Sequence, residues 1–418
     1  MINSHWLDLH QQAVAIEPEL GQMNIEALLN CGIVQPSLRG RTIEKIMADI
    51  DFIPKKILLI HSFQIGGVER EAATAISVLA SRNRLKDTLI LATDGLDTAS
   101  ICWFERCSNL VILQDYEESP LTLNDRILLL AQLINWWQPE AILNMHSYLG
   151  WRVLERFGKA LSRRTAWSVG LFCRDRGANG MPLSHADRFL RGCFPFIESI
   201  ICDNQEFIDI LVKDYALPHS LQKRFFCLYQ PVSVVNQISP PAIANKKVLW
   251  AGRLSPQKRP ELLGEIAALM PEVEFHVYSP EVSHNQLIEW NLLRSNIHIF
   301  KPFVAIHDIS VEDYCAFLFT SAYEGLPNIL LEIGSIGMPI VASIVGGVGE
   351  LITSDTGWPI KPGIREAQRF SDSLKQVLEG GGLVCNKVAN LANLIRSRHS
   401  VATYFDNAKV ASSFFRLI

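Results

Sequence analysis

The sequence has little of what marks several classes of protein. It contains 418 residues, 20% of them charged, and 39 Lys and Arg against 43 Asp and Glu give a formal charge of −4. No general positive charge therefore attracts nucleic acid or an anionic membrane. No uncharged apolar run of about 18 residues occurs, and residues 1–20 lack the basic and apolar regions of a secretory signal. We expect neither a membrane span nor a signal peptide.

The cysteines and the acidic residues also lack informative spacing. The 9 cysteines form no CxxC pair, which suits reduced thiols better than a disulfide framework and predicts a cytoplasmic protein. No group of His, Cys and Asp has metal-ligand spacing, and no DxD pair ends an apolar run. We therefore expect no metal and no bound cofactor.

What the sequence does contain is an alternation of short apolar runs and amphipathic stretches. Hydrophobic residues make up 48% of it, and at roughly 150 residues per domain the length allows two to three domains. Such alternation predicts an α/β fold in which helices cover both faces of parallel sheets. The expected strands lie at 56–61, 88–93, 110–113, 141–145, 166–172, 200–202, 247–251, 273–278, 297–300, 315–320 and 340–342.

The pattern also divides the chain into parts. Residues 1–52 have helical spacing without a compact apolar run, which indicates an N-terminal helical extension. Residues 234–246 are rich in Pro, Asn and small residues, as is typical of a linker. We predict two Rossmann-like domains, at 53–235 and 236–401, that face each other across a cleft. A last helix within 402–418 is expected to cross back onto the first domain.

The most informative segment runs from residue 323 to residue 342. Pro327 stands where the first residue of a helix is favoured, because proline lacks the amide that would be unpaired there. The amides of Asn328, Ile329 and Leu330 would then point out of a helix N-terminus, which can hold an anion.

Two carboxylates frame this helix. Glu324 precedes it and Glu332 lies in its second turn, so they cannot form one acid–base pair on a single helical face. We expect them to bind hydroxyls at two places on an extended ligand. A solvated surface glutamate is the alternative for Glu332, but its small and apolar neighbours favour burial, and a buried carboxylate needs partners.

A second cluster, residues 250–260, follows the first expected strand of the second half. Ligands of open α/β sheets bind beyond the carboxyl ends of the strands, where two fixed cations such as Arg253 and Lys258 would neutralise a diphosphate. Ordinary surface charge is the alternative for Lys258 and Arg259.

In order and spacing, these motifs resemble the donor-binding domain of glycosyltransferase family 4, the retaining nucleotide-sugar transferases of GT-B architecture. The resemblance spans residues 55–418. The matching motifs are Gly252-Arg253-Leu254-Ser255 with Lys258, Glu324 to Glu332 as a Glu-x7-Glu motif, and Gly346-Gly347-Val348-Gly349-Glu350.

The resemblance implies the transfer of a hexose from a UDP- or GDP-type sugar to a hydroxyl of a glycan or lipid-linked acceptor, in polysaccharide or lipopolysaccharide synthesis. Arg253 and Lys258 would hold the diphosphate and stabilise the leaving group. Glu332 would bind the ribose, and Glu324 would contact the transferred sugar. The resemblance also implies front-face substitution without a metal. The donor pocket would be completed by Gly325, Leu326, Pro327, Asn328, Ile329 and Leu330.

The first half carries weaker signals. Gly66 and Gly67 resemble the family's glycine-rich loop near the diphosphate and the acceptor, although tight turns also use such pairs. His146 matches a histidine that many members place beside the reacting sugar, and a structural histidine is the alternative. Residues 172–175 stand where another histidine often follows, so the acceptor side departs from the family pattern.

Arginines of the first half suggest an anionic acceptor, although a solvated face is the alternative, because Asp175 and Asp187 accompany them. A lipid-linked acceptor would bring the protein to the cytoplasmic face of a membrane. The arginines are Arg163, Arg164, Arg174, Arg176, Arg188 and Arg191.

Three alternative functions of the same architecture stay open: a nucleotide-sugar epimerase, a glycoside phosphorylase and a non-catalytic scaffold.

Overall fold

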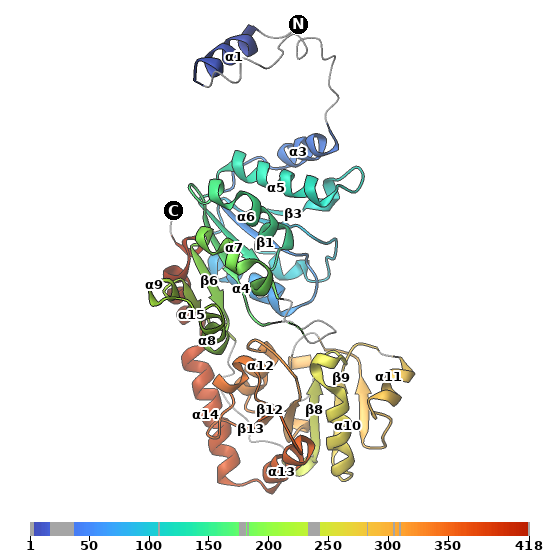
Figure 1. The fold of residues 1–418 in the computed structure, drawn as a ribbon. Coiled ribbons are helices and arrows are strands. Elements are labelled where there is room, and N and C mark those ends of the chain that lie inside the picture. The colour runs from blue at the N-terminus through green and yellow to red at the C-terminus, as the bar shows by residue number, and fades with distance from the viewer. Residues whose placement is uncertain are drawn as a thin grey trace.

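The structure is a computed structural model that contains two parallel sheets, one in each half of the chain (Figure 1). It describes residues 4–16, 37–107, 109–174, 181, 184–232, 243–281, 283–303, 306–308 and 311–416. The first sheet has seven strands in the order β3-β2-β1-β4-β5-β6-β7, and the second has six in the order β10-β9-β8-β11-β12-β13. The predicted α/β class is confirmed.

The strands match the predicted apolar runs closely, and two more complete the sheets. The additional strands are β7 (Phe225–Cys227) and β13 (Trp358–Ile360). The others are β1 (Lys56–Ile60), β2 (Thr88–Ala92), β3 (Leu110–Ile112), β4 (Ala141–Met145), β5 (Ala166–Gly170), β6 (Ser199–Cys202), β8 (Lys247–Ala251), β9 (Glu274–Tyr278), β10 (Ile297–Phe300), β11 (Ala316–Phe319) and β12 (Ile340–Ser343).

Strand β1 shows why these runs are continuously apolar. Ile57 and Leu59 belong to the core on one face of the sheet, whereas Leu58 and Ile60 belong to the core on the other face. Because successive side chains of a strand point to opposite faces, a strand covered on both sides must be apolar at every position.

The helices cover the sheets and are capped by side chains at several starts. The side chains of Thr122, Ser147 and Asn204 each accept a hydrogen bond from a backbone amide in the first turn of the helix that follows. The α-helices are α1 (Ser4–Ile16), α3 (Leu38–Asp49), α4 (Gly67–Ser81), α5 (Leu123–Trp137), α6 (Tyr148–Leu161), α7 (Arg191–Cys193), α8 (Gln205–Asp214), α9 (His219–Gln222), α10 (Pro260–Leu269), α11 (His284–Glu289), α12 (Asn328–Ser335), α13 (Glu366–Glu379), α14 (Gly382–Arg398) and α15 (Val401–Ala411).

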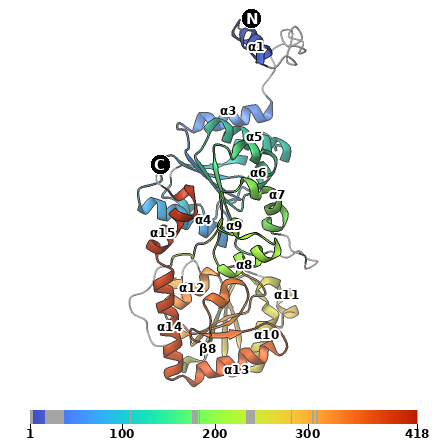
Figure 2. The same cartoon turned by 60° about the vertical axis from the view of Figure 1, so that its left-hand side comes forward.

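The end of the chain returns to the first sheet. After α14 runs along the second domain, α15 lies against the first (Figures 1 and 2). Tyr404 and Phe405 of α15, and Phe414 beyond it, are buried in the same core as Leu58. Each such side chain contributes roughly 1.5–3 kcal/mol on burial, so this contact fixes the end of the chain to the first domain.

Near the N-terminus, α3 packs Ile43 and Ile46 into the core of the first sheet. The predicted linker at 234–246 lies mostly outside the described residues. No helix in the described part of the chain is long and apolar enough to cross a membrane. All the cysteines described by the structure are free.

Candidate active site

The loops after β8 and β11 lie side by side, because these strands are neighbours in the second sheet. Lys258 Nζ lies 2.5 Å from Glu324 Oε1, and both side chains are largely buried. Gln257 links the two loops by two hydrogen bonds. Its side-chain amide donates to the Tyr323 carbonyl at 3.1 Å, and its backbone carbonyl accepts from the Ala322 amide at 2.8 Å. The fold thus joins two predicted site residues from separate motifs.

The loop after β8 carries three cationic side chains, Arg253, Lys258 and Arg259, and their surroundings differ. Arg259 makes a bidentate pair with Glu366, at 2.9 and 3.0 Å, inside the C-terminal domain. Arg253 is exposed and has no ion-pair partner among the described residues. Arg253 and Lys258 are therefore the cations at this edge that suit a diphosphate, whereas Arg259 holds its own domain together.

Helix α12 begins at Asn328, as expected, but Pro327 precedes the helix and is not its first residue. Pro327 is its N-cap, with φ −65° and ψ 122°. The Leu330 amide donates to the Pro327 carbonyl at 3.0 Å, so the prediction of three free amides was wrong at Leu330. Within the described segments the amides of Asn328 and Ile329 have no hydrogen-bond partner. This helix end retains two donors for an anion.

Glu332, the predicted ribose-binding residue, pairs with an arginine of the other domain. Its side chain is 14% exposed, and its partner Arg70 lies in the first turns of α4. The pair brings the carboxylate beside the glycine-rich start of that helix. A ribose that hydrogen-bonds Glu332 must share the carboxylate with Arg70 or displace it.

Gly66 and Gly67, which precede Arg70, are in different surroundings. A Cβ on Gly66 would lie 2.3 Å from Glu69 Oε2, whereas a Cβ on Gly67 would meet nothing within 4 Å. Glu69 is buried, accepts from Gln64 Nε2 at 3.0 Å, and has its pKa raised by burial. Gly66 therefore serves local packing, and Gly67 leaves the backbone accessible.

Asp203, which no sequence motif pointed to, is a buried carboxylate that holds the loop before α12. Asp203 follows β6 in the first domain, and its Oδ2 accepts from the Leu326 amide at 2.8 Å. A Cβ on Gly325 would lie 2.6 Å from the same oxygen, so this position needs glycine. Burial raises the pKa of Asp203 to about 7, against the hydrogen bonds from Leu326 and Asn204. Its signal in the sequence was an acidic residue directly after an apolar run.

The turn Gly346–Glu350 packs against the same loop. Gly346 has φ +51°, and a Cβ there would lie 2.0 Å from the Glu324 carbonyl oxygen, so only glycine fits. Glu350 accepts from the Glu206 amide at the start of α8, at 2.8 Å. The candidate donor loops therefore contact the first domain through Asp203, α8 and Arg70.

Three strand ends of the first sheet bring polar side chains together. His61 follows β1, Asp94 follows β2 and His146 follows β4. His61 Nδ1 lies 3.9 Å from Asp94 Oδ2, and Oδ1 of the same carboxylate accepts from the Leu149 amide at 3.0 Å. His146 has φ +68°, and its backbone forms an isolated antiparallel β-bridge with Ile60. This left-handed conformation is uncommon outside glycine, and such outliers often occur at functional sites.

The ring of His146 packs edge to face on His185, with ring centroids 4.6 Å apart. His185 also packs against Trp151 and Phe189. Burial, followed by the charge of His146, lowers the pKa of His185 to about 3, so this imidazole is neutral. The family pattern often has a second histidine near 172–175, where this chain has none, and no motif pointed to His185 in a later segment.

The predicted arginine cluster is only partly available to an acceptor. Arg174 lies 2.9 Å from Asp187 and 2.6 Å from Asp214, so it is paired within the first domain. Arg188 lies over the ring of Tyr148, 5.6 Å from its centroid. Arg163, Arg164 and Arg191 are exposed, and Asp175 and Arg176 lie outside the described residues.

Two Rossmann-like domains in one chain, with candidate ligand loops at the carboxyl ends of their strands, define a GT-B fold. The apo form of the lipopolysaccharide outer core galactosyltransferase WaaB superposes with a TM-score of 0.64 at 18% identity, covering 85% of this chain and 98% of that chain. Alr3699/HepE of Anabaena, in complex with UDP, gives a TM-score of 0.65 at 17% identity, with coverage of 85% and 98%. These likenesses confirm the predicted architecture.

Sequence comparison adds the family. Residues 237–396 match the family described as glycosyl transferases group 1, as the motifs of this half of the chain predicted. The O-antigen biosynthesis glycosyltransferase WbnH of Escherichia coli is 33% identical over 106 residues, which cover 25% of this chain and 31% of WbnH. The probable O-antigen biosynthesis glycosyltransferase WbiN of Escherichia coli matches to the same extent. The matched stretch thus spans less than a third of these curated relatives.

Proposed function

We propose that this protein is a retaining glycosyltransferase that moves a hexose from a UDP- or GDP-sugar to a hydroxyl of a glycan or lipid-linked acceptor in cell-surface polysaccharide synthesis. The match to the glycosyl transferases group 1 supports the reaction class. The O-antigen relatives support the acceptor class. The HepE complex with UDP supports a uridine nucleotide as the first donor to test.

The pairing of Lys258 with Glu324 carries this proposal. The bond that breaks in the donor joins the sugar to a diphosphate oxygen, so groups that bind its two sides must be neighbours. Lys258 suits the departing diphosphate and Glu324 suits the sugar hydroxyls, and their side chains are 2.5 Å apart. A cation fixed where negative charge develops stabilises the transition state.

Further groups complete the proposed site. Arg253 and the amides of Asn328 and Ile329 add positive potential for the diphosphate. Glu332 binds the ribose hydroxyls, with Arg70 beside it. His146 acts on the sugar from the first domain, at the carboxyl edge of its sheet.

The test begins with the donor. UDP-, GDP- and ADP-sugars are screened for thermal stabilisation, since a ligand at 100 times its Kd adds about 2.7 kcal/mol to the free energy of unfolding. The stabilising sugar is then incubated with lipid-linked oligosaccharides, and the product's anomeric configuration is read by NMR. The proposal expects nucleotide diphosphate release, a new glycosidic bond and retention.

Each rival function gives a different product. An epimerase returns an isomerised nucleotide sugar without an acceptor, and a phosphorylase forms a sugar phosphate only when inorganic phosphate is present. A scaffold binds the nucleotide sugar with no turnover on any acceptor of the panel. Each of these results would refute glycosyl transfer, and the variant Lys258→Met is the catalytic control.

A second test concerns metal ions in the reaction. Because Lys258, Arg253 and the start of α12 supply the positive charge at the diphosphate, turnover should persist in EDTA. Activity that is lost in EDTA and restored by magnesium or manganese would contradict this assignment.

A further inference from the structure

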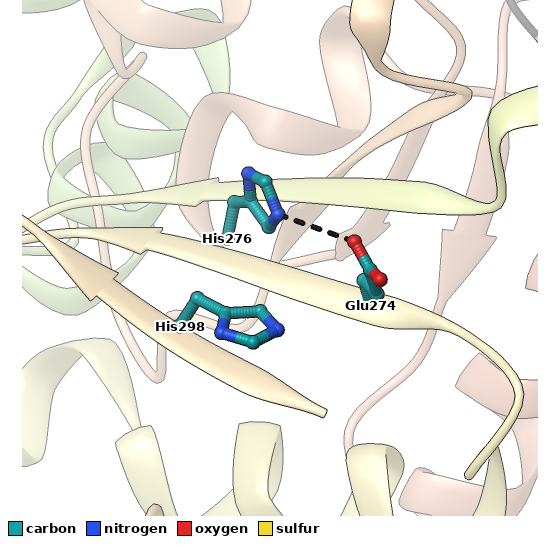
Figure 3. A group of neighbouring side chains, drawn as sticks. All are labelled: Glu274, His276 and His298. Carbon is teal, nitrogen blue, oxygen red and sulfur yellow. Dashed lines mark ion pairs between the residues drawn. The ribbon is translucent and has the colours of Figure 1, made fainter. Parts of the chain in front are cut away.

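Strands β9 and β10 place two histidines and a glutamate on one face of the second sheet, at its edge (Figure 3). Glu274 and His276 are two residues apart on β9, so their side chains point to the same face. His298 of β10 is in register with His276. The two strands thus bring together residues that are distant in sequence, which is why no metal-ligand spacing was visible in the chain.

The donor atoms of these three side chains lie within 4.8 Å of one another. His276 Nε2 lies 3.6 Å from Glu274 Oε2, and the rings of His276 and His298 are 5.5 Å apart between centroids. Glu274 and His298 are exposed, so their side chains can rotate toward a common ion. Ligands of tetrahedral zinc lie roughly 2.0–2.2 Å from the metal, which requires only a modest approach.

His276 is already oriented for such a role. Its Nδ1 lies 3.0 Å from the hydroxyl of Tyr314, which lies 3.1 Å from the hydroxyl of Tyr278. With Nδ1 in this hydrogen bond, Nε2 is left facing Glu274. Metal-binding histidines typically use their second ring nitrogen in this way, which fixes the tautomer and the orientation of the ring.

One charged neighbour opposes a cation at this place. Lys247 of β8 is in register with Glu274 of β9, so its ammonium group lies on a strand next to the carboxylate. The binding experiments below therefore measure the affinity of the three side chains with this charge present.

We propose that Glu274, His276 and His298 form a zinc site that joins the edge strand β10 to β9. Two imidazoles and a carboxylate suit Zn²⁺ better than Mg²⁺ or Ca²⁺, which prefer oxygen ligands only. A water molecule takes the fourth position. Since β10 has a neighbour on one side only, the ion stabilises the free edge of the donor domain. This site is separate from the Lys258–Glu324 pair and takes no part in the proposed transfer.

The test uses the full chain and the metal alone. Chelator-treated protein is titrated with ZnCl₂ by calorimetry and with CoCl₂ by visible absorption, because cobalt reports tetrahedral coordination. We expect one ion per chain and a higher melting temperature with zinc. His276→Ala and His298→Ala should each weaken binding at least tenfold. Tyr314→Phe should weaken it about 10- to 100-fold, because it removes the hydroxyl that orients the His276 ring.

His219→Ala is the matched control, because His219 is an exposed histidine of α9 in the first domain. It should bind zinc as the wild type does. The proposal is overturned if the wild type binds no zinc at 100 times the protein concentration, or if the His276→Ala/His298→Ala double variant binds with unchanged affinity and stoichiometry. Since the readouts are binding and stability, a failed glycosyl transfer assay would not affect the result.

Discussion

The two domains build their parts of the candidate site in different ways. In the C-terminal domain, Lys258 and Glu324 come from loops after neighbouring strands, and short motifs in the chain contain them. In the N-terminal domain, His146 and His185 meet across a long stretch of sequence, and packing rather than an ion pair joins them. The proposed donor side can thus be recognised from local sequence motifs, whereas the proposed acceptor side depends on tertiary structure.

The same difference appears in how charge is balanced. The donor-side groups are paired with opposite charges, Lys258 with Glu324 and Arg259 with Glu366. On the acceptor side, burial dominates, and it keeps His185 neutral. Substitutions on the donor side should therefore change binding and transition-state charge, and substitutions on the acceptor side should change the rate with less effect on nucleotide affinity.

The largest effect is expected for Lys258→Met. It removes the cation at the proposed leaving group but keeps the apolar stem, so kcat should fall about 100- to 1000-fold, as when one charge-stabilising group of an active site is lost. The measurement is steady-state nucleotide diphosphate release with the donor found in the screen.

Its neighbour provides the control. Arg259→Met breaks the pair with Glu366 and should lower the melting temperature while kcat of the folded protein stays within about threefold. If both variants lose activity equally at full folding, the distinction between these two cations is wrong.

A somewhat smaller loss, about 100-fold in kcat, is expected for His146→Ala, as for other displaced active-site groups. In the proposed site the donor binds mainly to the C-terminal domain, so the nucleotide Kd should stay within about twofold of the wild type. Rapid-quench kinetics and calorimetry separate the two quantities.

The variant His185→Phe sharpens this test, because it keeps an aromatic ring against Trp151 and removes both nitrogens. If His185 only positions His146, His185→Phe should lower kcat by less than His146→Ala does. A melting temperature that collapses in His146→Ala would return this histidine to a structural role.

Much of the fold follows from the sequence because a parallel sheet covered on both faces demands uninterrupted apolar runs. Runs such as 56–60 and 141–145 were visible for that reason. Strand β7 has only three residues, Phe225 to Cys227, and β13 contains Pro359. Both are edge strands, and the proline of β13 weakens its pattern. Length alone does not explain why β7 was missed, because β3 is an edge strand of the same length and was predicted.

The sequence suggested a candidate site where residue type and spacing point to a chemistry, as for Lys258, Glu324 and Glu332, whose roles stay predictions. The site was not predictable where the partner comes from the other domain, as for Asp203 beneath Leu326 and Arg70 beside Glu332. Such pairs depend on how the domains sit against each other, and no local pattern records that.

The contact between the domains can be tested through nucleotide binding. Glu332→Ala removes a charged hydrogen-bond partner of the proposed ribose, worth roughly 1.5–3 kcal/mol, so the Kd should rise about 10- to 150-fold in calorimetry. Arg70→Ala frees the same carboxylate and should change the Kd far less, by roughly threefold in either direction. A Kd unchanged within twofold in Glu332→Ala would end the ribose assignment.

The last effect is on stability and depends on Asp203. Its pKa is about 7 in the folded protein and near 4 when unfolded, so the folded state binds the extra proton between these values. Stability should therefore fall as pH rises from about 4 to 7, by up to about 1.4 kcal/mol per pH unit, and level off above 7. Burial is the main cause of the raised pKa of Asp203, and the nearby carboxylate of Glu350 acts in the same direction. Asp203 in turn helps to raise the pKa of the buried Glu71.

Asp203→Asn keeps an oxygen for the Leu326 amide and removes the ionisation, so its melting temperature should depend less on pH and exceed that of the wild type at pH 8. The control Asp209→Asn removes an exposed carboxylate of α8 and should follow the wild-type curve. Melting curves of all three proteins from pH 4.5 to 8.5 decide the matter. If Asp203→Asn retains the wild-type slope, the pH dependence comes from other buried carboxylates such as Glu71, and Asp203 serves the donor loop through its hydrogen bond alone.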